Sequence, residues 1–223
     1  MKVSAILLAR VLAFVDVSDF SPRGGLFFPE VVKELVQHCS FQKFPGSLDE
    51  WKSEEGGQFL VGKLGKTVIE KMVLYNNGIL VETRSGTSDS ARVVEEVLDW
   101  AQGKFAMACG REAIKRWAYV NDVSFYSDVP LLMTGPIERL ARNISAEMSK
   151  VLGQETVYEP TGFNIGHDPL LKKYSSAQFT IHRRAEVPFA ENKYFSEAPL
   201  PTEVHLDLLA QYEKDVAQML NVR

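Results

Sequence analysis

The chain has 223 residues, of which 45% are hydrophobic and 24% are charged, and its formal net charge is −4. A chain of this length and composition is typical of a globular protein that buries a core without disulfides or structural metals. The acidic balance argues against a protein whose whole surface binds nucleic acid, because neutralising phosphates requires clustered lysines and arginines.

The N-terminal segment predicts a buried first strand or hairpin. Arg10 interrupts its apolar run, and Asp16 and Asp19 close it, so the pattern fits neither a signal peptide nor a membrane span of about 20 residues. The two cysteines, Cys39 and Cys109, form no CxxC pair, which favours free thiols in a reducing compartment. We therefore expect a cytoplasmic protein that does not associate with a membrane.

A short helix is expected next, beginning near Pro29, which suits a first helical position because it has no N–H to satisfy. Its apolar face is formed by Val31, Val32, Leu35, Val36 and Cys39. The polar connection that follows, "FQKFPGSLDEWKSEEGGQ" at residues 41–58, is the best candidate for a functional loop in the first half, since binding sites concentrate on loops.

Two turns separate the β-rich runs of residues 59–84. Asn76-Asn77-Gly78 predicts a tight hairpin, in which the asparagine pair would supply positive φ angles. "GKLGKT" at residues 62–67 resembles a phosphate-binding loop superficially, but its spacing is wrong and it lies between two β-rich runs, so we interpret it as a turn.

Three helices, a strand and two extended segments, at about residues 155–165 and 175–184, complete the expected elements. The helix after the hairpin takes Ser88, Asp89 or Ser90 as its N-cap and can end at Gly103. In the second half, a period-two strand has one face formed by Trp117, Tyr119, Val123 and Phe125, with Asn121 as the polar exception. A helix between Pro136 and Gly153 carries an apolar stripe at Ile137, Leu140, Ile144, Met148 and Val151. A last helix, starting at Pro201 or Thr202, carries one at Val204, Leu208, Tyr212, Val216 and Leu220.

This order of elements is not the regular strand–helix alternation of a parallel doubly wound sheet. It predicts an α+β fold, mainly an antiparallel sheet with helices packed on one face. Residues 1–104 and 105–223 have a similar strand–helix–strands–helix order, and they are either two α+β halves that share a core or parts of a single domain.

The candidate ligand-binding residues are His182, Arg183 and Arg184, at the end of a predicted strand. Because side chains alternate along a strand, His182 and Arg184 lie on its polar face, opposite Ile181. One interpretation is a site for a phosphorylated or nucleotide ligand, with an arginine holding the anion and His182 as acid or base. The other is a solvated strand face that ends in a basic pair protecting a sheet edge.

His167 belongs to the turn "NIGHDP" at residues 164–169. The Asp168 side chain can accept a hydrogen bond from the backbone two residues on, and Pro169 fixes φ, so the segment is typical of a turn. A catalytic His-Asp pair between neighbours in the chain rarely achieves the required geometry. His167 therefore remains a second candidate ligand contact beside the arginines.

Familiar catalytic and cofactor motifs are missing from the sequence. It has no phosphate-binding loop, no dinucleotide fingerprint and no serine-hydrolase elbow, and the four histidines show no metal-ligand spacing. We therefore assign no catalytic residue, no metal and no cofactor, and the sequence favours a protein that is not an enzyme.

The connecting loops are rich in aromatic residues, which would bury well in a partner interface. The candidate interface residues are Phe27, Phe28, Phe41, Phe44 and Trp51. The first hypothesis is a non-enzymatic cytosolic module that binds a protein partner or forms a homo-oligomer; the aromatics could instead fold back onto the core. The alternatives are the enzyme or sensor described above and a single-stranded nucleic-acid binder using basic segments at 111–117 and 172–184.

Overall fold

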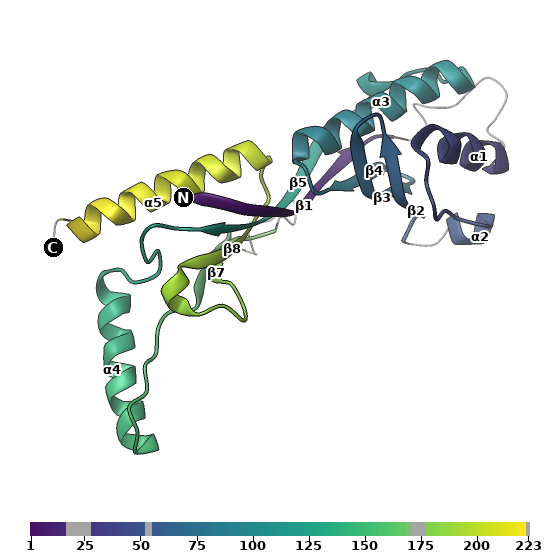
Figure 1. The fold of residues 1–223 in the computed structure, drawn as a ribbon. Coiled ribbons are helices and arrows are strands. Elements are labelled where there is room, and N and C mark those ends of the chain that lie inside the picture. The colour runs from purple at the N-terminus through teal and green to yellow at the C-terminus, as the bar shows by residue number, and fades with distance from the viewer. Residues whose placement is uncertain (17–27, 52–54, 169, 171–176, 222–223) are drawn as a thin grey trace. The chain divides into compact units, whose positions relative to one another are not determined.

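The computed structural model describes residues 1–16, 28–51, 55–168, 170 and 177–221 (Figure 1). The described strands form one mainly antiparallel sheet in the order β2-β3-β4-β1-β5-β8-β7-β6, so the predicted α+β class is confirmed. The strands are β1 Lys2–Phe14, β2 Gly57–Leu64, β3 Thr67–Tyr75, β4 Gly78–Thr83, β5 Arg116–Tyr126, β6 Gly162–Ile165, β7 Phe179–Arg183 and β8 Lys193–Ala198. The α-helices are α1 Phe28–Cys39, α2 Leu48–Trp51, α3 Thr87–Phe105, α4 Gly135–Leu152 and α5 Thr202–Asn221, with 3₁₀ turns at Arg111–Ala113 and Phe189–Glu191.

The chain divides into two compact units. The N-terminal unit comprises residues 6–121 and 199–202, and the C-terminal unit comprises residues 1–5, 122–198 and 203–223. The long strands β1 and β5 each contribute residues to both units.

In the N-terminal unit, helices α1 and α3 pack against one face of the sheet and form a single apolar core with it. Alternate residues of β1 point into it, and Val11 and Ala13 are fully buried there together with Phe59 of β2 and Val94 of α3. The opposite face carries ion pairs such as Arg10–Glu82, at 2.7 Å. Within this unit the helices cover one face of the sheet, as the sequence predicted.

Both predicted turns of this unit are present. β3 and β4 form the hairpin, with Tyr75 paired to Gly78 across the two-residue loop. The expectation of positive φ was wrong, because neither Asn76 nor Asn77 adopts it. The turn between β2 and β3 contains Gly65 at φ 56°, a conformation that glycine adopts without steric cost, so "GKLGKT" is a turn.

The N-terminus of α3 is capped from elsewhere in the chain. The predicted local caps do not act, and Ser90 instead donates to the buried carbonyl of Ala9, at 2.8 Å. The Thr87 N–H donates to Oγ1 of Thr202, and the Thr202 N–H donates to Oγ1 of Thr87, at 3.0 and 2.8 Å. Thr202 Oγ1 also donates to Oδ1 of buried Asn121, at 2.9 Å, which explains the polar exception in β5.

The buried face of α5 agrees only in part with the apolar stripe that the sequence predicted. Val216 is buried and Tyr212 and Leu220 are half-buried, whereas Val204 and Leu208 are exposed. The buried positions along the helix are Thr202, His205, Leu209, Glu213 and Val216. Three of these five residues are polar, so hydrophobic periodicity did not identify the full buried face.

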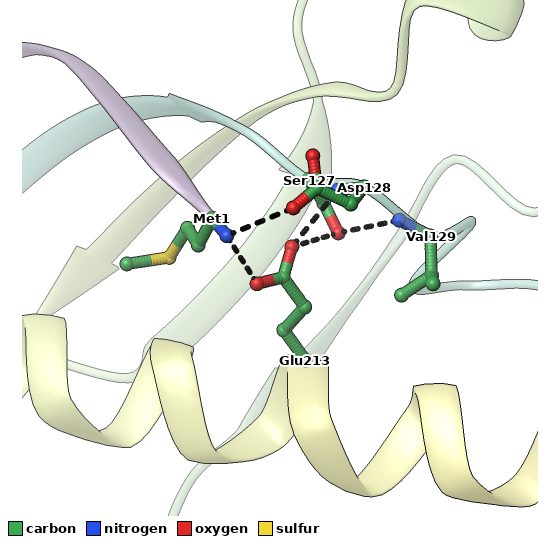
Figure 2. Close-up of polar contacts among 5 residues, drawn as sticks. All are labelled: Met1, Ser127, Asp128, Val129 and Glu213. Carbon is green, nitrogen blue, oxygen red and sulfur yellow. Dashed lines mark hydrogen bonds and ion pairs between the residues drawn. The ribbon is translucent and has the colours of Figure 1, made fainter.

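Glu213 is buried because it meets three hydrogen-bond donors (Figure 2). Its carboxylate is paired with the amino group of Met1, and it accepts from Ser127 Oγ at 2.6 Å and from the Asp128 N–H at 2.9 Å. Burial alone would raise the pKa of Glu213, but these hydrogen bonds outweigh burial and hold the pKa below its ordinary value. The same carboxylate raises the pKa of the Met1 amino group.

Among the described residues, no helix combines the length and the apolar character needed to cross a membrane.

Candidate interaction surface

Helix α4 of the C-terminal unit has the boundaries that the sequence predicted. Gly135 and Pro136 open it after an extended Thr134, and Pro at this point loses no intrahelical hydrogen bond. Gly153 ends it at φ 66°, the left-handed conformation in which glycine commonly terminates helices. The predicted stripe therefore lies on one continuous helix.

The apolar stripe of α4 is exposed to solvent. The exposed fractions are 50% for Ile137, 59% for Leu140, 40% for Ile144 and 75% for Val151, and Met148 is half-buried. Ala141 is the only buried residue described in this helix. An apolar row on a helix normally faces a core, so a row left in water marks a surface that another element can cover.

The segment that follows α4 runs back along the helix and is fastened to it by two serines (Figure 1). Ser149 Oγ accepts from the Thr156 N–H at 2.9 Å, and Ser145 Oγ accepts from the Tyr158 N–H at 2.8 Å. Both hydroxyls in turn lie within donating distance of carbonyls of the helix, Ala141 O for Ser145 and Ser145 O for Ser149. This polar side of α4 is satisfied locally, and the apolar side is not covered by the segment.

The returning segment also carries exposed apolar side chains. Val157 is 71% exposed and Tyr158 is 41% exposed. We call the exposed apolar residues of α4 and of this segment the α4 patch; it comprises Ile137, Leu140, Ile144, Met148, Val151, Val157 and Tyr158. Exposed apolar residues gathered on one helix are typical of protein–protein contact sites.

Of the five aromatic residues predicted for an interface, the structure describes the side chains of Phe41 and Phe44, and these two differ in burial. Phe41 is buried in the core of the N-terminal unit, 5.3 Å from the ring of Phe59, so it packs against its own protein. Phe44 is half exposed, in the loop after α1, and lines two shallow hollows there. Phe27 and the side chains of Phe28 and Trp51 lie outside the described residues.

Of the predicted anion-binding residues, Arg183 already makes contacts within its own unit. Its side chain is only 4% exposed and pairs with Glu159 at 2.7 Å. It also donates to the carbonyl of Phe189 at 2.6 Å, and its guanidinium lies 4.4 Å from the centre of that ring. A paired, stacked arginine has lost much of its attraction for a free anion.

The other candidates do not converge with it. On β7, His182 Nε2 donates to Asn164 Oδ1 of β6 at 2.9 Å, since an amide oxygen can only accept. Arg184 is half-buried just beyond the end of that strand. His167 is exposed, and Asp168 Oδ1 accepts from the Leu170 N–H at 2.8 Å, so the predicted turn chemistry is confirmed.

Arg183 nevertheless lines a hollow of about 470 Å³. Apolar walls come from Pro130, Met133, Phe189 and Leu220. Nε of Arg183 is buried and has no hydrogen-bond partner, but with almost no accessible surface it offers no contact to a ligand in the hollow.

Sequence reasoning missed a buried serine–histidine contact in the same unit. Ser196 Oγ lies 2.8 Å from Nε2 of His205 and 2.5 Å from the carbonyl of Thr180. A carbonyl can only accept, so the one hydroxyl proton goes to Thr180 and His205 Nε2 donates to Ser196. The histidine therefore cannot act as the base that activates this serine, and both side chains are fully buried. The contact is structural.

The basic segments proposed for nucleic acid are partly neutralised. In 111–117, Arg111 donates to Asp99 at 2.6 Å, and Arg116 lies 4.0 Å from the centre of a phenylalanine ring. The start of 172–184 lies outside the described residues. The two segments belong to different units.

No group of three or more His, Cys, Asp or Glu residues that could hold a metal ion occurs among the residues that the structure describes. No protein-family model and no curated protein matches this chain. The candidate site must therefore be interpreted from its own geometry, and the α4 patch is the feature on which that interpretation rests.

Proposed function

We propose that this chain is a non-enzymatic protein-interaction or self-assembly module that makes contact through the α4 patch. The observation that supports it is the exposure of the α4 stripe, with Leu140 59% and Val151 75% exposed. Covering apolar surface is worth about 25 cal/mol per Å², so an uncovered amphipathic helix gains stability when another protein packs on it. A cytoplasmic location is part of the proposal, since both cysteines are free thiols.

A first experiment asks whether the patch is free in the folded protein. Leu140→Glu should leave the free energy of unfolding within about 0.5 kcal/mol of wild type, because it changes a side chain that packs on little. Leu209→Glu, at a fully buried position of α5, should unfold the C-terminal unit. If both variants lose stability alike, the α4 stripe is packed inside the protein and the proposal is wrong.

A second experiment asks whether the patch meets protein. A photo-crosslinking amino acid at Leu140 should form adducts with protein in the native cell. The matched control is Leu208, a leucine that is 47% exposed on α5, where adducts should be rare. Absence of any Leu140 adduct would refute a contact role for this surface.

A second candidate function is supported by the hollow that Arg183 lines. Its apolar walls would suit a small neutral ligand, because a free phosphate would face the carboxylates of Glu138 and Glu159. This candidate differs from the enzyme or sensor for a phosphorylated or nucleotide ligand that the sequence offered, because it takes a neutral ligand and is centred on Arg183 rather than on His182 or Arg184. Titration with N-acetyl-leucine amide and with inorganic phosphate, followed by NMR, would test it; a response to phosphate alone, or to neither, would count against it.

A further inference from the structure

The apolar stripe of α4 has the same spacing in both directions along the helix. Its residues are Ile137, Leu140, Ile144, Met148 and Val151, separated by three, four, four and three positions. Two antiparallel copies related by a twofold axis at Ile144 would set Ile137 level with Val151, and Leu140 level with Met148. A twofold interface requires such a self-complementary surface.

An antiparallel pair is favoured over a parallel one by the electrostatics of the helix. In a parallel pair in register, every charged residue would lie level with its own counterpart, and like charges repel. Antiparallel helix dipoles also attract, whereas parallel dipoles repel.

The area of the patch is sufficient for a weak dimer. From the exposed fractions, two copies would bury roughly 1,000 Å² of side-chain surface in total, which is near the lower limit of specific interfaces. An interface of this size is expected to assemble reversibly as concentration rises.

We propose that α4 pairs antiparallel with α4 of a second copy of this chain, centred on Ile144, to form a twofold dimer. This inference rests on the proposed function, because it names the partner of the same surface. Each copy then covers the apolar row of the other, while the serine-fastened side of each helix stays turned away.

Sedimentation equilibrium from about 1 to about 200 µM tests the pairing. The average mass of the wild type should rise from one chain toward two. Leu140→Glu and Ile144→Glu should weaken association at least tenfold, whereas Leu208→Glu, which adds the same charge at an exposed leucine of α5, should not change it. A wild type that stays monomeric, or a loss of association in Leu208→Glu equal to that in Leu140→Glu, would overturn the proposal.

Cross-linking tests the orientation in a Cys109→Ser background, because Cys39 is buried and burial raises its thiol pKa to about 12. Ile137→Cys mixed with Val151→Cys should be joined by a short bismaleimide. Either variant alone should not, since 14 residues of helix separate the two positions by about 21 Å. Homodimers of Ile137→Cys formed more readily than mixed dimers would overturn the antiparallel arrangement.

The outcomes also separate this inference from the proposed function. A monomeric wild type whose Leu140 adducts contain a different protein refutes the dimer and leaves the interaction module intact. No adduct of any kind, together with a monomer, refutes both.

Discussion

Removal of the buried imidazole of His205 should flatten the pH dependence of stability between pH 7 and pH 5. His205 is fully buried, its Nε2 donates to Ser196, and its ring meets that of Phe179 edge-on at 5.5 Å. Burial lowers its pKa from an ordinary 6.5 to about 4, because the charged form would have to leave water.

The direction in which stability changes with pH follows from the lowered pKa of His205. Above pH 6.5 the imidazole is neutral in both the folded and the unfolded chain, and its full contribution to stability is present. As the pH falls toward 4, the unfolded chain takes up a proton that the folded chain does not, so stability is lost. The difference between 6.5 and about 4 corresponds to a full loss of about 3 kcal/mol, of which about 2 kcal/mol falls between pH 7 and pH 5.

Urea unfolding followed by far-UV circular dichroism measures this loss. Wild type should lose about 2 kcal/mol more than His205→Gln over this pH interval. All three tryptophans belong to the N-terminal unit, so their fluorescence records whether that unit responds separately. His167→Gln, which removes an exposed imidazole, controls for the loss of one histidine. Parallel pH profiles for wild type and His205→Gln would refute the reasoning.

Three further substitutions test other features of the fold. Val61 has φ 53°, a left-handed conformation that costs a β-branched residue about 1–2 kcal/mol. Val61→Gly should therefore raise the free energy of unfolding, measured in urea, by about 0.5 kcal/mol. A loss of stability would show that the backbone of Val61 is not strained. Glu213→Gln should lower the free energy of unfolding by about 2 kcal/mol at pH 7. Because the pKa of Glu213 is lowered and the pKa of the Met1 amine is raised, the difference from wild type should fade as the pH falls below 4.5 or rises above 8.0. A difference that stays constant with pH would contradict the ion pair. Thr202→Val removes the hydroxyl that caps α3 and bonds Asn121, so it should lower the free energy of unfolding by about 1–3 kcal/mol, seen as a lower melting temperature. Thr202→Ser keeps a hydroxyl and should retain most of the stability. Equal losses in the two variants would argue against the role of the hydroxyl.

Features set by neighbouring residues were predicted well. The Asn76-Asn77 hairpin, the Gly65 turn and the start and end of α4 were all correct. Each depends on a proline, a glycine or a short polar side chain that restricts the chain within a few residues. The positive φ expected at the asparagines was wrong, because two-residue loops admit more than one turn type.

Helix α5 shows where pattern reasoning failed. Its buried face includes Thr202 and Glu213, whose partners Thr87 and Met1 come from distant parts of the sequence. It also includes His205, whose partner Ser196 lies on the strand before the helix. A polar side chain can be buried when its hydrogen bonds are satisfied, but the sequence does not show which donors will arrive. The apolar residues Val204 and Leu208 were therefore assigned to the core, and they are exposed.

The sequence by itself determined the α+β class and the apolar stripe of α4, because periodicity and turn residues act over short stretches of chain. Only the tertiary structure decided that this stripe faces water, that Phe41 is in the core and that Arg183 is paired with Glu159. The physical reason is that an apolar row requires some neighbour but does not specify which one. Whether that neighbour is the chain's own core or another molecule depends on contacts between residues far apart in the sequence.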